Sequence, residues 1–127
     1  MKKYAQQVAI ANSDGWTHVS VVINGFNHTG IEPPTGVLYT GKDPVYGHYQ
    51  PLPEYTYDLN PIHKALRKLS NGQFELVLDA LRDITGNSAR THEEELQELR
   101  AFHSASAAQW SEAYLKALHL WEYPANL

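Results

Sequence analysis

The sequence changes its periodicity at residues 41–60, and this change decides what the chain can fold into. Before the segment, short runs of β-branched and aromatic residues are typical of strands. After it, apolar residues recur every three or four positions, as in amphipathic helices. The segment itself has neither period, yet it holds many prolines and tyrosines: Pro44, Pro51, Pro53, Tyr46, Tyr49, Tyr55 and Tyr57. The pattern predicts an α+β fold, with an antiparallel sheet followed by helices.

The first forty residues predict an antiparallel meander of three or four strands. Turn residues mark its boundaries, because Asn12-Ser13-Asp14-Gly15 offers a hairpin loop and Asn24-Gly25 favours a type I′ turn. The expected strands lie around Val8 and Ile10 and over residues 16–23, 26–31 and 36–40.

The second half predicts three or four helices that pack on one face of the sheet. Asn60-Pro61 places a capping residue before a proline at the first helical position. Ser70 and Gln73 have the spacing of a capping box, and Gly86 is typical of a helix end. A helix is therefore expected on each side of Ser70.

Two interpretations of the segment from Thr91 to Tyr123 stay open. Its apolar pattern favours one long or kinked helix, whereas the small residues at 104–108 allow two helices that form a hairpin. His103 lies on the apolar side, where we expect either a core histidine or a titratable group at a pocket or interface. Large aromatic residues on the same side are expected at an oligomer interface: Phe102, Trp110, Tyr114 and Trp121.

Length and composition exclude several classes of protein. The 127 residues suit one domain, with a meander over 1–40, an extended Pro/Tyr-rich crossover over 41–60 and a helical part over 61–127. The lack of cysteine excludes disulfides and thiolate chemistry. No run approaches the roughly 20 apolar residues of a membrane span, and no signal peptide is recognisable, so we expect a cytoplasmic protein without membrane contact.

Charge argues against a nucleic-acid partner. The net charge is −4, from 10 basic and 14 acidic residues, whereas binding to phosphates requires an excess of positive charge. The nearest basic patch is His63-Lys64-Arg67-Lys68, which a solvated helix face explains equally well.

No catalytic residue, cofactor or metal ligand is predicted. The seven histidines lack the three- or four-residue spacing of a helical metal site. A site assembled from His18, His28 and His48 remains an alternative. Signatures of a serine nucleophile, a Walker loop or a dinucleotide-binding loop are missing.

The segment 41–60 is the best candidate for a binding surface. Prolines keep it extended and reduce the entropy lost on docking, while tyrosines offer large contact areas with few rotatable bonds. It can act as a binding arm, as a lid on its own sheet, or as both. The candidate partner- or ligand-binding residues are Tyr39, Tyr46, His48, Tyr49, Tyr55, Tyr57, Arg100 and His103.

These features lead to three functional hypotheses. The first is a small non-enzymatic binding protein, an adaptor or inhibitor, that contacts another protein and self-associates as a homodimer or larger homo-oligomer. The second is a sensor or sequestering protein for a nucleotide-like ligand, with a pocket between the sheet and the segment 41–60. The third is a metal-dependent hydrolase built from dispersed histidines.

Overall fold

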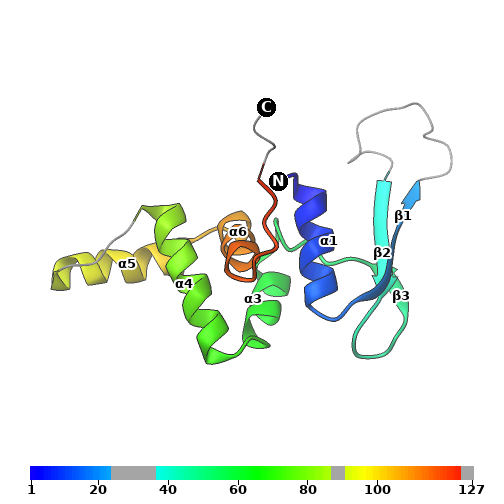
Figure 1. Ribbon diagram of the computed structural model, residues 1–127, viewed down its shortest axis with the longest axis horizontal. Helices are drawn as coiled ribbons and strands as arrows, with labels where there is room; N and C mark the ends of the chain where they lie inside the picture. Colours follow the sequence, from blue (N-terminus) through cyan, green and yellow to red (C-terminus); the bar gives the residue numbers. More distant parts are fainter. Residues whose placement is uncertain (24–36, 87–90, 124–127) are drawn as a thin grey trace.

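The chain folds as an α+β protein, which confirms the predicted class (Figure 1). The computed structural model describes residues 1–23, 37–86 and 91–123. Its elements, in order, are α1 (Lys3–Ser13), β1 (Thr17–Ile23), β2 (Val37–Lys42), β3 (Tyr49–Pro51), α3 (Leu59–Arg67), α4 (Asn71–Thr85), α5 (His92–Ser104) and α6 (Ala107–Ala117).

Helix α1 lies between the sheet and the other helices (Figure 1). The ring of Tyr4 stacks on that of Tyr39 from β2, with centroids 5.9 Å apart. Gln7 Nε2 donates to the backbone oxygens of Leu52 and Pro53, at 3.2 and 3.0 Å. These contacts fix the helix against the sheet.

The prediction of a strand around Val8 and Ile10 is wrong, because both residues lie in α1. Alternation of two apolar residues fits a strand, but Gln6, Ile10 and Ala11 are the buried residues of this segment. Their spacing of four and five positions belongs to a helix. The segment Asn12-Ser13-Asp14-Gly15 therefore ends a helix rather than joining two strands.

The sheet has the order β1-β2-β3, and both pairs are antiparallel. β2 confirms the expected strand near 36–40 and extends it to Lys42, while the expected strand over 26–31 lies outside the described residues. The interpretation of 41–60 as irregular is wrong in part, since β2 and β3 form a hairpin with Thr40 opposite Pro51 and Lys42 opposite Tyr49. The strand pattern is too short there to stand out against the prolines.

A register shift interrupts the pairing of β1 with β2 between Thr17 and Ser20. His18 lies in this shift with φ +53°, in the left-handed region. An L-residue with a β-carbon pays about 1–2 kcal/mol for that conformation, and glycine does not.

We therefore expect His18→Gly to be more stable than His18→Ala by about 1 kcal/mol, because only glycine relieves the left-handed strain. Urea unfolding of the two variants measures the difference. The same pair of substitutions at Ser20, an exposed position beyond the register shift, is the control and should give the opposite order. Equal stability of the two His18 variants would contradict a strained conformation at this position.

Helix α4 begins as the sequence predicts, whereas α3 begins at Leu59, with Asp58 rather than the predicted Asn60 as its cap. The Asp58 side chain caps α3 by accepting from the backbone N–H of Asn60. Ser70 and Gln73 form a capping box at the start of α4, and Gly86 ends α4 with φ +73°. The capping signals thus locate α4 correctly, whereas Asn60 and Pro61 lie inside the first turn of α3, where a proline is tolerated because its missing N–H would have no partner in the helix.

The segment 91–123 forms two helices rather than one. Ala105 leaves the helical conformation with ψ 137°, and Ser106 then starts α6 through a capping box with Gln109. This Ser-x-x-Gln signal outweighs the continuous apolar pattern. α5 extends away from the body of the molecule, whereas α6 passes through its centre (Figure 1).

The core surrounds α6, which packs against α1, α3 and α4. Its largest fully buried side chains come from α1, the segment before α3, α3, α4 and α6: Tyr55, Tyr114, Ile10, Ile62, Leu81, Leu115, Val77 and Ser111.

Candidate functional site

A groove of about 660 Å³ separates the β2–β3 turn from helix α3. Its floor is formed by Asp14, Trp16 and Tyr55, and the turn residues 43–46 form one wall. The other wall carries the basic residues of α3 and its C-terminal cap: Lys64, Arg67 and Lys68.

Asp43 organises the turn on the first wall. Its Oδ1 accepts from the backbone N–H groups of Val45 (3.0 Å) and Tyr46 (2.6 Å), and its Oδ2 accepts from that of His48 (3.0 Å). Gln50 Nε2 donates to the same Oδ2 at 3.0 Å. These bonds, above all that from Tyr46, lower the pKa of Asp43 below its ordinary value, because they favour the ionised form. The turn therefore keeps its charged organiser at neutral pH.

The turn presents apolar side chains to solvent. Val45 is 75% exposed and Tyr46 is 77% exposed. The ring of Tyr46 stacks near that of His48, with centroids 6.1 Å apart, and Tyr49 meets His18 edge-on at 6.4 Å. Because hydrogen bonds already fix the backbone of this turn, the turn loses little backbone entropy on contact with another molecule.

The floor rests on the carboxylate of Asp14, whose side chain is only 8% exposed. Tyr55 Oη donates to Asp14 Oδ2 at 2.9 Å. Asp14 Oδ1 is buried and accepts no hydrogen bond from the described residues. Its charge is instead compensated by Lys68, whose Nζ lies 2.9 Å away. The carboxylate is thus paired on both sides.

Tyr55 connects this carboxylate to the core. Its side chain is 1% exposed, and its backbone oxygen accepts from Ser111 Oγ of α6 at 2.7 Å. Burial raises the pKa of Tyr55, and the adjacent charge of Asp14 raises it further. The phenol therefore stays protonated and acts as a donor.

The basic wall supplies the free charge of the groove. In the described parts of the chain, Lys64 and Arg67 make no ion pair. The carboxylates of the groove are each engaged, since Asp14 binds Tyr55 and Lys68, Asp43 binds its own turn, and Asp58 caps α3. The two cations remain available to a carboxylate or a carbonyl oxygen of a ligand.

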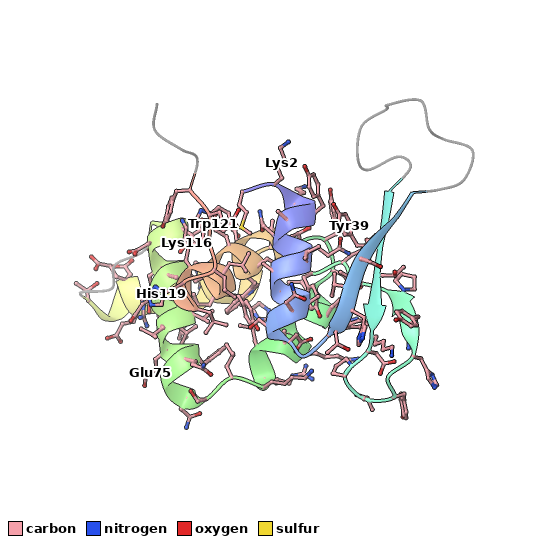
Figure 2. All side chains as sticks on the ribbon, turned by 45° about the vertical axis from the view of Figure 1, so that its right-hand side comes forward. Lys2, Tyr39, Glu75, Lys116, His119 and Trp121 are labelled. Carbon is pink, nitrogen blue, oxygen red and sulfur yellow. The ribbon has the colours of Figure 1, made fainter. Side chains whose placement is uncertain are left out.

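The predicted binding residues lie in separate places. Tyr46 and Tyr55 line the groove, with His48 and Tyr49 next to it on the hairpin. Tyr57 is exposed, with Lys3 Nζ 4.3 Å from its ring centroid, and Tyr39 faces α1 (Figure 2). Arg100 and His103 belong to α5, where His103 is exposed rather than in the core.

The segment 41–60 is buried at some of its tyrosines and exposed at others. Tyr55 packs into the body as a lid would, while Tyr46, Tyr49 and Tyr57 stay exposed. The second wall of the groove was not predicted as a binding surface. The run of basic residues at 63–68 is the sequence signal that indicates it. Of these, His63 instead packs edge-on against Trp110, with ring centroids 5.3 Å apart.

The four aromatic residues predicted at an oligomer interface do not share one surface. Trp110 and Tyr114 are 6% and 1% exposed, so they belong to the core of the protomer. Trp121 is partly buried beneath Lys116, whose Nζ lies 5.3 Å from its ring (Figure 2). Phe102 is half-buried beside Arg82 of α4. The wide apolar face of the sequence mostly reflects the central position of α6.

The structure also bears on the hypothesis of a metal-dependent hydrolase and on the question of membrane contact. No group of three histidine, aspartate or glutamate residues in the described ranges is arranged to hold a metal ion, and His28 lies outside those ranges. None of the helices described here is long and apolar enough to cross a membrane.

Comparisons with protein-family models, with curated proteins and with solved structures find no match to this chain.

Proposed function

We propose that this protein is a non-enzymatic binding module that captures an extended segment of another protein in the groove between the β2–β3 turn and α3. The observation that carries the proposal is the pre-organised turn, which exposes Val45 and Tyr46 beside a groove with a buried, hydrogen-bonded floor. Such a module acts as an adaptor or an inhibitor, and the lack of cysteine suits a reducing compartment such as the cytoplasm.

The groove favours a particular kind of segment. Trp16 and Tyr46 offer aromatic surface to an apolar side chain. On the opposite side of the groove, Lys64 and Arg67 can donate hydrogen bonds to carboxylates or backbone oxygens of the bound segment. An extended segment with an apolar residue next to an acidic one satisfies both walls.

A small planar anion is the second candidate ligand. The groove volume of about 660 Å³ lies within the range of small-molecule sites. Tyr46 can stack on a base while Lys64 and Arg67 meet phosphate groups. This pocket lies between the turn and α3 rather than between the sheet and the segment 41–60.

Selection from a random peptide display library tests the protein-binding proposal. We expect the selected peptides to share an apolar residue next to an acidic residue. Tyr46→Ala should weaken their binding at least ten-fold, since exposed tyrosines are frequent hot spots. Fluorescence anisotropy with labelled peptides measures the affinities.

Tyr123→Ala is the matched control, because Tyr123 is 73% exposed but lies outside the groove. Its affinity for the same peptides should equal that of the wild type. Peptides that bind the Tyr46 variant as tightly as the wild type would refute the groove as the site. Selection of no peptide, together with ATP binding that Tyr46→Ala abolishes, would favour the small-anion alternative.

A further inference from the structure

Helix α5 has no buried side chain among those described, unlike α1, α3, α4 and α6. It contacts α4 through Arg82, whose Nε donates to Glu98 Oε1 at 2.9 Å and whose guanidinium carbon lies 5.5 Å from the ring centroid of Phe102. The sheet lies at the opposite end of the molecule (Figure 1). One side of α5 is thus attached, and another side is free to meet a partner.

The free side carries an apolar strip. Leu96 and Leu99 are 45% and 62% exposed, and His103, also exposed, follows them one turn later. A helical step of 100° per residue places these three side chains within a narrow sector. With Arg100 and Ser104 they line a shallow hollow of about 460 Å³.

Charges are distributed unequally along the same helix. Its first turn is acidic and includes Glu93, whereas Arg100 and His103 lie near its C-terminal end. Glu93 and Arg100 are seven residues apart, so they share one flank of the leucine strip. A helix with opposite charges at its two ends is complementary to an antiparallel copy of itself.

We propose that α5 binds α5 of a second copy of this chain in antiparallel orientation, around a twofold axis between Leu96 and Leu99. In this register Leu96 packs against Leu99 of the second copy. Glu93 then lies within about one helical turn of Arg100 of the second copy, and symmetry repeats the pair. Antiparallel packing also aligns the helix dipoles favourably.

The size of the strip sets the strength of the dimer. One pair of helices of 13 residues each buries less surface than a standard stable interface, so we expect a weak dimer with a Kd on the order of 100 µM. Because α5 and the β2–β3 hairpin lie toward opposite ends of the molecule (Figure 1), both grooves of the dimer should remain open. A partner with two binding segments would then be held by avidity.

Sedimentation equilibrium over a wide range of protein concentration tests the pairing. We expect the wild type to form dimers that Leu99→Lys abolishes. Glu93→Lys and Arg100→Glu should each weaken the dimer about three- to ten-fold, because each places like charges together at two sites. An equimolar mixture of these two variants should recover dimerisation, since every facing pair is then opposite in charge.

Val45→Lys is the control, because Val45 is 75% exposed at the far end of the molecule and its variant should dimerise like the wild type. Circular dichroism of each variant verifies the fold. A wild type that stays monomeric near 1 mM assigns this face to another partner and overturns the proposal, as does a mixture that fails to recover dimers. Peptide binding by the α5 variants should be unchanged, so the groove and α5 are tested independently.

Discussion

Asp14→Ala is expected to lower the free energy of unfolding by about 2–3 kcal/mol, since hydrogen bonds to charged groups contribute about 1.5–3 kcal/mol. The substitution removes the acceptor of the buried Tyr55 hydroxyl, which lies 2.9 Å from Asp14 Oδ2. It also releases Lys68, but this side chain is 53% exposed and regains water. Most of the loss therefore comes from the unpaired phenol rather than from the broken ion pair. Thermal and urea unfolding, monitored by circular dichroism, measure it.

A double-mutant cycle separates these contributions. Tyr55→Phe leaves the carboxylate of Asp14 with Lys68 alone, and we expect it to cost about 2 kcal/mol. The double variant should cost less than the sum, because each substitution removes the same hydrogen bond. Asp83→Ala, at an exposed position of α4, should change stability by less than about 0.5 kcal/mol. If the two single effects add fully, Tyr55 and Asp14 are not coupled.

The backbone of Asp14 makes this substitution interpretable. With φ −80° and ψ 2° at the end of α1, the position suits alanine as well as aspartate. Any effect therefore arises from the side chain. Since Asp14 orients both Tyr55 in the floor and Lys68 in the wall, Asp14→Ala is also expected to weaken peptide binding to the folded protein.

Local signals in the sequence predict those elements whose ends depend on adjacent residues. The capping box of Ser70 and Gln73 and the glycine at 86 locate α4 because each acts through its own backbone neighbours. The equivalent motif of Ser106 and Gln109 lies inside a continuous apolar pattern, yet α5 ends just before it and α6 starts with it. A capping motif inside an apolar stripe is thus better evidence for a boundary than the stripe is for continuity.

The groove could be predicted only in part, because its residues come from distant parts of the chain. The exposure of Tyr46 can be predicted from its place in an irregular segment that contains prolines, since turns in such segments leave side chains in solvent. The pairing of Tyr55 with Asp14 spans 41 positions, and no local pattern announces it. Asp14 looked like a turn residue in the sequence, whereas its carboxylate is the buried centre of the floor.

Gly41→Val is expected to destabilise the protein by about 3 kcal/mol through overpacking. Gly41 is buried in β2, opposite Gln50 of β3. A β-carbon at this position would lie 3.1 Å from the backbone oxygen of Thr17 and 3.3 Å from side-chain carbons of Val19 and Leu52. The two side chains can shift, but the oxygen of Thr17 belongs to a strand and cannot move alone.

The close contact between β1 and β2 at Gly41 explains why a substitution there should also change the groove. Thr17 borders the register shift of β1, so its backbone comes close to β2 where only glycine leaves room. Displacing β2 shifts the turn at 43–46, which follows it directly, relative to the wall formed by α3. We therefore expect Gly41→Ala, with a cost of about 1–2 kcal/mol, to stay folded and bind the selected peptides more weakly.

Gly72→Ala provides the comparison that makes this result specific. A β-carbon at Gly72 meets no atom within 4 Å, and the residue lies in the first turn of α4. Alanine there should be neutral or stabilise the protein by up to about 1 kcal/mol, because it restricts the unfolded chain. If Gly41→Val unfolds at the same urea concentration as the wild type, the close approach of β1 to β2 is not a constraint on this fold. The position of the turn would then depend on α3 and on Asp43 alone.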